Sequence, residues 1–302
     1  MVTALVAVVL VLLTPGEAWA WGPITHLTHG VGALASLTIA SATLQRILRR
    51  HRLEYLYGCV GADITQAKKY TRAQQAHCHS WEVGWELLSR AHSDGQRAFA
   101  WGYLTHLAGD VYSHNHYVPT QMIVSFRGRA LRHIYWEARF DIMQPNQPRD
   151  VIRELREHEF PECDRLVEEV VARTLFSFRM DKRIFNSFIA VHDLDQWHKI
   201  LGRITERSRF GLPLSLLEKY NGACNASVLE LFLRGKDSSC QQSDPTGFHA
   251  LEQAKHIRAT LRTLLRKGNI SAALDAKVKA LDDNRNLDLP CCSPLHEGEK
   301  KG

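Results

Sequence analysis

The order of apolar and polar residues predicts helices over most of the chain. Apolar residues recur every three or four positions, which places them on one face of an α-helix, and the alternation typical of strands is scarce. The segments with helical spacing are residues 31–50, 80–92, 94–113, 127–143, 148–180, 195–208, 213–234, 246–266 and 270–281. We therefore expect an all-α fold, built as a multi-helix bundle.

Glycine and proline mark the expected turns between these helices. The turns are expected at Gly58 and Gly61, at Pro119, at Pro145 and Pro148, at Pro161, and within 211–213 and 243–247. No internal repeat is visible, and a chain of 302 residues can bury one large core or two small ones. We expect a chemistry-bearing helical region at 21–144, a C-terminal helical region at 145–285 packed on it, and a disordered tail at 286–302.

The first twenty residues have the pattern of a signal peptide. Residues 2–13 (VTALVAVVLVLL) are continuously apolar but too short to span a bilayer comfortably. Ala18, Trp19 and Ala20 then supply the small-x-small motif that precedes cleavage. The positively charged start of a signal peptide is missing, so a buried N-terminal helix is the alternative. We expect cleavage after Ala20, a mature soluble chain that begins at Trp21, and a secreted or periplasmic location.

Composition narrows the chemistry only slightly. Export would permit disulfides, but the seven cysteines are an odd number and none of them forms a CxxC pair. Cysteine is therefore not expected to be the main metal ligand. The net charge of +6 favours an anionic partner, such as a phospholipid, a nucleic acid or another phosphate ester, without choosing among them.

Histidines and acids gather in the first half of the chain at helical spacings. His106 and Asp110 are four residues apart, so both side chains leave the same helix face and can meet one ion. His114 continues that face one turn on, and His116 lies just beyond it. A single pair of this kind is more often a surface contact than a metal site.

The same pattern recurs on either side of this helix, which favours a metal site over chance. His133 and Glu137 are again four residues apart, and Asp63 upstream is followed by His77 and His79 in the sequence HCH. Imidazole and carboxylate groups are the ligands of catalytic zinc, which keeps open positions for water and substrate.

The expected new N-terminus adds a further ligand. Cleavage after Ala20 would leave the free α-amine of Trp21, which titrates near pH 8 and can give up its proton to a metal. This nitrogen and the carbonyl oxygen of the same residue form a five-membered chelate. His26, five residues on, could complete the ligands of that ion. The alternative is that Trp21 is only a core aromatic residue.

The ordered set of these residues resembles the ligand series of the zinc-dependent phospholipase C family. The series is Trp at the mature start, a following His, then Asp, His, His-x3-Asp, His and His-x3-Glu, over residues 21–140. The fungal single-strand nucleases share most of it, including the Trp start with a His five residues later. Those nucleases prefer Asp at the position of Glu137, so this residue favours the phospholipase C family over the nucleases.

The resemblance implies a helical fold of the phospholipase C and single-strand nuclease type, with up to three zinc ions. Its first site would be held by Asp63, His77 or His79, His106 and Asp110. The second site would be held by the amine and carbonyl of Trp21, by His26, and by the other oxygen of Asp110, so that Asp110 bridges two ions. The third site would be held by His114 or His116, with His133 and Glu137.

The resemblance also implies a reaction. We expect phospholipase C-type cleavage of a phospholipid or another phosphodiester by a metal-activated water, which Asp63 would orient or deprotonate as the catalytic residue. Contact with a membrane surface would then be peripheral. A nuclease or another phosphodiesterase on the same scaffold, with nucleic acid as its partner, is the first alternative, and a non-catalytic zinc-binding protein is the second. The sequence leaves the oligomeric state open.

Overall fold

The computed structural model describes residues 21–65, 77–128, 133–171, 177–206, 208 and 210–283. The expected signal peptide and tail lie outside these residues. The described part consists of helices and confirms the all-α prediction. Its elements are α2 (Pro23–Ala35), η1 (Leu37–Ile39), α3 (Ala42–Arg50), α4 (Arg52–Gly58), η2 (Gly61–Asp63), α5 (Trp81–Arg90), α6 (Asp94–Tyr112), η5 (Ser113–Tyr117), α7 (Val118–Val124), α8 (His133–Ile142), α9 (Arg149–Glu157), α10 (Pro161–Val170), α11 (Phe178–His192), α12 (Asp195–Glu206), α13 (Leu214–Arg234), η6 (Gly235–Asp237), η7 (Ser239–Gln242), α14 (Phe248–Arg266) and α15 (Ala272–Asp283).

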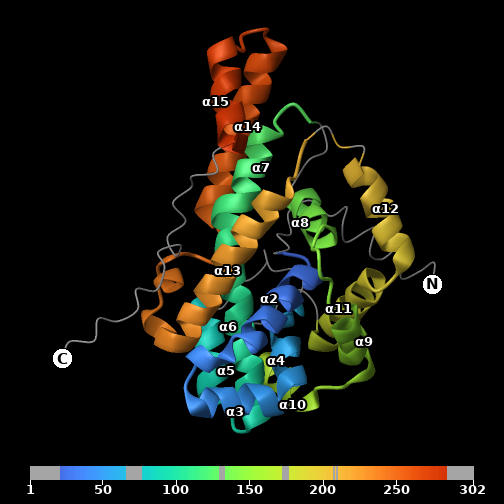
Figure 1. The fold of residues 1–302 in the computed structure, drawn as a ribbon, viewed down its shortest axis with the longest axis vertical. Helices are drawn as coiled ribbons and strands as arrows, with labels where there is room; N and C mark the ends of the chain where they lie inside the picture. The colour runs from blue at the N-terminus through green and yellow to red at the C-terminus, as the bar shows by residue number, and fades with distance from the viewer. Residues whose placement is uncertain are drawn as a thin grey trace, which may run out of the picture.

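Helix α6 lies at the centre of the fold and contacts α2, α3, α4, α5, α10 and α13 (Figure 1). From Ala98 to Tyr112 every residue of α6 except the partly exposed Trp101 is buried. A helix that is buried on all sides must satisfy any polar side chain it carries from its neighbours. The histidine and aspartate of α6 therefore point into protein rather than into water. One apolar core runs from Trp21 to Ala254 and includes residues of both expected regions.

Two glycines allow α4 to pack directly against α6. A Cβ atom at Gly102 would lie 1.9 Å from the backbone oxygen of Tyr55, and one at Gly58 would lie 2.0 Å from the backbone oxygen of Phe99. Both positions therefore require glycine for a close approach of two backbones. The residue after α4, Cys59, is thereby placed beside the buried face of α6.

Two segments that were predicted as single helices are each divided into shorter helices in the structure, so these two predictions are wrong. Residues 31–50 break between α2 and α3, because Ser41 caps a new helix by accepting a hydrogen bond from the backbone N–H of Leu44 at 3.3 Å. Residues 148–180 divide into α9 and α10, and then the start of α11. Pro161 occupies the first position of α10, where proline lacks no needed hydrogen bond.

The region after α6 also differs from the expectation. Pro119 was expected in a turn, but it lies in the first turn of α7, where its missing N–H is tolerated. Between α6 and α7, η5 is a π-helix, in which the backbone N–H of Val118 bonds to the oxygen of Ser113 five residues back. Single π-turns of this kind occur frequently at functional sites. This one carries His114 and His116.

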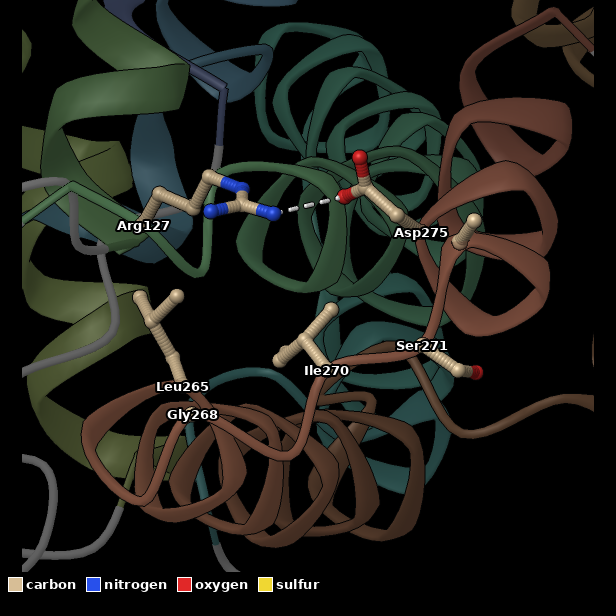
Figure 2. A pocket seen from close by; sticks show the side chains of 7 residues that line it. Arg127, Leu265, Gly268, Ile270, Ser271 and Asp275 are labelled. Carbon is tan, nitrogen blue, oxygen red and sulfur yellow. Dashed lines mark hydrogen bonds and ion pairs between the residues drawn. The ribbon is translucent and has the colours of Figure 1, made fainter.

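The last two helices form an arm that extends from the body beside α7 (Figure 1). A small apolar cluster of Phe126, Leu261 and Val278 joins the arm to α7. A cavity of about 350 Å³ opens between them, and across it the Arg127 guanidinium pairs with Asp275 at 2.9 Å (Figure 2).

Among the described residues, no helix is both long and apolar enough to cross a membrane. Cys59, Cys78, Cys163 and Cys224 are buried free thiols.

We predict that Gly102→Ala lowers the free energy of unfolding by several kcal/mol, because the new methyl group would force α4 and α6 apart. The matched control is Gly222→Ala in the interior of α13, where a Cβ atom would meet nothing within 4 Å. That change should be neutral or stabilise by about 1 kcal/mol, since alanine favours helices. Urea unfolding of the two variants checks this. Equal effects at both positions would contradict the assigned helix contact.

Candidate metal centre

Four of the sequence-predicted ligands surround the carboxylate of a fifth, Asp110 on α6. His26 Nε2 lies 3.3 Å from Oδ1, whereas His79 Nε2 and His106 Nε2 lie 3.2 and 3.1 Å from Oδ2. Asp63 approaches the same group through Oδ1, which is 3.5 Å from His79 Nε2. The two oxygens of Asp110 thus face different histidines, and all five side chains are buried.

The contact at the outer nitrogen of His106 fixes which tautomer its neutral ring adopts. Its Nδ1 lies 2.9 Å from the backbone oxygen of Cys59, which can only accept a hydrogen bond. Nδ1 must therefore carry the proton, so the neutral ring presents a lone pair at Nε2. This Nε2 lies 3.1 Å from Nε2 of His79, whose own Nδ1 is 3.3 Å from Cys78 Sγ. Partners on the outer nitrogen are typical of metal-binding histidines.

A second group forms one turn further along. His114 Nε2 lies 3.3 Å from Glu137 Oε1, and His133 Nε2 lies 2.5 Å from the same oxygen. Asp110 and His114 are four residues apart, and so are His133 and Glu137. This spacing places each pair on one helix face, where η5 and α8 contact each other. Ligand atoms of His114, His133 and Glu137 lie within 4.8 Å of one another, as do those of His79, His106 and Asp110 and those of His26, Asp63 and His106.

The described residues provide too few hydrogen-bond donors for the buried acceptor atoms of these two groups. His26 Nε2, both oxygens of Asp110 and Glu137 Oε2 are buried and have no hydrogen-bond partner there. Such atoms are costly to bury unless something else satisfies them. A divalent cation would do so for carboxylate and imidazole groups together, and this donor set suits zinc. The residues present therefore fit the metal that the sequence predicts.

Burial shifts the pKa values of the titratable side chains in these groups. It is the main cause that lowers the pKa of His26 to about 4, and electrostatic repulsion from the adjacent His106 (ring centroids 3.8 Å apart) adds to it, so the ring is neutral. Burial also raises the pKa of Glu137 to about 8, against the opposing hydrogen bond with His114. For Asp110, burial works in the same upward direction, but His106 and His26 outweigh it and hold the pKa well below its usual range. A bound cation would favour the ionised carboxylates.

Trp21 lies against the same part of α6. Its indole N–H donates to the backbone oxygen of Gly109 at 3.0 Å, and its ring packs on Phe140 and Tyr117 at centroid distances of 4.0 and 5.0 Å. The residue is 1% exposed. The side chain therefore holds the expected first residue of the mature chain next to the residue that precedes Asp110.

Asp141 holds the beginning of α2, and the sequence did not single it out. Its Oδ1 accepts the backbone N–H of Thr25 at 2.7 Å, and a Cβ atom at Gly22 would lie 2.3 Å from its carboxylate carbon. The carboxylate thus takes the place of a side chain at Gly22 and fixes the backbone between Trp21 and His26. The available signal was its spacing, because Asp141 follows Glu137 by four residues on α8.

Two alternatives that the sequence left open are separated by these distances. His77 does not face Asp110, because its Nδ1 accepts the backbone N–H of His79 at 3.0 Å. His116 lies beside Tyr112, with ring centroids 5.9 Å apart, and is not grouped with Glu137. His79 and His114 are the members of the two pairs that lie within 3.3 Å of Asp110 and Glu137. His29, three residues after His26, contacts Asn221 of α13 through Nε2 at 3.0 Å.

Comparison with known proteins gives one match. The family model for zinc-dependent phospholipase C matches residues 25–199, which is more than half of the chain and includes every described candidate ligand except Trp21. No curated protein and no solved structure matches the chain.

We predict that Asp141→Asn removes a pH dependence of stability. Burial raises the pKa of Asp141 from 3.8 to about 7, so the folded state binds this proton more tightly than the unfolded state does. The resulting stabilisation is complete below about pH 4 and is lost as the pH rises through 7. Relative to wild type, the variant should gain up to roughly 4 kcal/mol between pH 4 and pH 8, at about 1.4 kcal/mol per pKa unit.

The measurement is urea unfolding of both proteins across this pH range. The matched control is Asp150→Asn on α9, where the carboxylate is 89% exposed, and it should leave the pH profile unchanged. Parallel profiles for wild type and Asp141→Asn would show that the carboxylate does not carry the burial penalty.

Proposed function

The chain belongs to the zinc-dependent phospholipase C family, and from that premise we propose that it is an exported enzyme that cleaves phospholipids between glycerol and phosphate. Family membership supports a phosphodiester hydrolase in general. The proposal adds the export of the protein, the identity of the ligands and the class of substrate.

The observation that carries the proposal is the position of Asp110. Its Oδ1 faces His26, and its Oδ2 faces His79 and His106. A carboxylate that presents each oxygen to a different set of imidazoles can bridge two cations. Paired cations are the arrangement that holds the attacking and leaving oxygens of a phosphodiester in line.

The proposed ligand sets follow from the distances. Asp63, His79, His106 and Asp110 would hold one ion, and His114, His133 and Glu137 would hold another. His26 and the other oxygen of Asp110 would share the third ion with the amine and carbonyl of Trp21, once the signal peptide has been removed. The α-amine becomes available only by cleavage after Ala20, so export and metal binding are linked in this proposal.

Zinc, when bound, lowers the pKa of a water ligand to about 7 and neutralises charge on the phosphoryl oxygens. The protein supplies the position of every group around it. The neutral ring of His106 would direct its lone pair inward, because the Cys59 oxygen accepts the hydrogen bond of the outer N–H. Asp63 is 4% exposed and lies at the edge of the Asp110 group, where it can accept the proton of the attacking water.

The proposed substrate is a phospholipid, reached by peripheral contact with a membrane surface. The family description supports this class, and the net charge of +6 suits an anionic headgroup or bilayer surface. Single-stranded nucleic acid is the alternative phosphodiester.

We predict that His106→Ala and Asp110→Ala each lower hydrolysis by about 100-fold or more, while most of the helix content remains. Even the partners of metal-binding residues contribute about 10- to 100-fold, so loss of a ligand should exceed that. Hydrolysis of phosphatidylcholine vesicles and of bis(p-nitrophenyl) phosphate measures the loss, and circular dichroism measures the helix content.

The matched control for these variants is His116→Ala. This histidine lies on η5 beside His114 but outside the groups, so its removal should leave most of the activity. Full activity of either His106→Ala or Asp110→Ala would refute the proposed centre. Hydrolysis of single-stranded DNA with no action on lipid would retain the centre and replace the substrate.

We also predict that a protein with one extra residue before Trp21 binds one zinc ion fewer than the mature protein and loses most of its activity. The extra peptide bond would convert the chelating amine into an amide, which does not bind zinc at neutral pH. Metal analysis of both forms, with the first residue confirmed by sequencing, makes the comparison. The control carries the extra residue at the C-terminus and should bind as much zinc as the mature form. Equal zinc content in the N-terminally extended and mature forms would contradict chelation by Trp21.

A further inference from the structure

The turn at 243–247 presents its backbone oxygens to three side chains of the N-terminal half. The oxygen of Ser243 accepts from Trp81 Nε1 at 2.9 Å, and that of Asp244 accepts from Asn115 Nδ2 at 2.8 Å. The oxygen of Pro245 lies 2.6 Å from His114 Nδ1. Three successive carbonyl groups thus contact α5 and the π-helix η5. The last contact involves a proposed metal ligand.

The turn keeps its shape through its own hydrogen bonds. Asp244 accepts the backbone N–H of Thr246 at 2.9 Å and its hydroxyl at 2.5 Å, and Gly247 donates its N–H to the oxygen of Asp244 at 3.0 Å. Thr246 Oγ1 in turn accepts the N–H of Phe248 at the start of α14. Because these contacts lie within the turn, its carbonyl groups are oriented before they meet His114.

Gly247 brings the turn into direct contact with His114. A Cβ atom at Gly247 would lie 2.4 Å from both the Cβ and the backbone oxygen of His114. Gly247 also has φ +57° and ψ +25°, in the left-handed region. The position therefore excludes any side chain, and the reason is mainly the close approach to His114.

We propose that the turn at 243–247 is a positioning element that sets the tautomer and direction of the His114 ring for metal binding. The Pro245 oxygen can only accept, so His114 Nδ1 must donate, and in the neutral ring the lone pair is then at Nε2. That Nε2 points at Glu137 Oε1, 3.3 Å away, in the group with His133. The turn leads directly into α14, so the C-terminal part of the chain contributes to a centre whose ligands all come from residues 21–137.

This inference rests on the proposed function, because it assumes that His114, His133 and Glu137 hold a cation. It assigns a role to residues outside the ligand series and outside the family match at 25–199. The expected effect of losing the turn is confined to one ion. The Asp110 group makes no contact with the turn among the hydrogen bonds and ion pairs of the described residues.

The test compares Gly247→Ala with Gly235→Ala in the mature protein. Gly235 also has φ +57°, with ψ −123°, which is at least as unfavourable for alanine, but its Cβ would come no closer than 3.8 Å to Trp85. Backbone strain is therefore present in both variants, and only Gly247→Ala displaces His114. The readouts are zinc stoichiometry by metal analysis and the absorption spectrum of the protein reconstituted with Co²⁺.

Gly247→Ala should lose one ion, or bind it about 10- to 100-fold more weakly, with a change in the Co²⁺ spectrum. Gly235→Ala should keep the wild-type stoichiometry and spectrum. Identical metal binding in the two variants would overturn the inference. If Gly247→Ala does not fold, Asp244→Ala decides, because it removes the bonds that shape the turn and adds no clash. A wild-type Co²⁺ spectrum for Asp244→Ala would then overturn the inference.

His114→Ala separates this inference from the proposed function. If His114→Ala loses an ion while Gly247→Ala behaves like Gly235→Ala, the metal centre stands and the positioning role of the turn is wrong. If His114→Ala keeps every ion and full activity, the assignment of an ion to His114, His133 and Glu137 is itself wrong.

Discussion

The structure depends on a buried cluster of acids and imidazoles that the protein cannot satisfy alone. Asp110 is fully buried on a helix that is surrounded on all sides, and both of its oxygens lack hydrogen-bond donors among the described residues. Glu137 has the same deficit at Oε2. A buried carboxylate is strongly unfavourable unless positive charge and hydrogen-bond donors around it are sufficient. A divalent cation would resolve both deficits, and this would link the proposed ligands to the core.

Backbone carbonyl groups decide how the ligands face the cation. The oxygen of Cys59 holds the outer proton of His106, and the oxygen of Pro245 does the same for His114. Each carbonyl is placed by glycines that let two segments approach closely, Gly58 and Gly102 for the first and Gly247 for the second. Helix packing and ligand protonation are therefore linked in this fold.

The sequence predicted the parts of the centre that have a local pattern. The pairs His106/Asp110 and His133/Glu137 were found because helical spacing of four residues alone places them together. The sequence could not show that His79 rather than His77 lies beside Asp110, or that His114 rather than His116 lies beside Glu137, because these positions depend on the turn before α5 and on the π-helix after α6. Asp141 was missed because it accepts a hydrogen bond from a helix that is distant in the sequence. The Pro245 oxygen was missed because it is a backbone atom, which no residue pattern reveals. Too few helices were predicted, because α4, α7 and most of α11 were not recognised and because capping at Ser41 divides a continuous apolar pattern.

The most direct measurement is anomalous X-ray diffraction at the zinc edge from crystals of the mature protein. The account predicts one peak within coordination distance of His79, His106 and Asp110. It predicts a second on the His26 side of Asp110 next to the α-amine of Trp21, and a third among His114, His133 and Glu137. Peaks confined to surface residues, with Asp110 and Glu137 instead contacted only by protein donors, would contradict it.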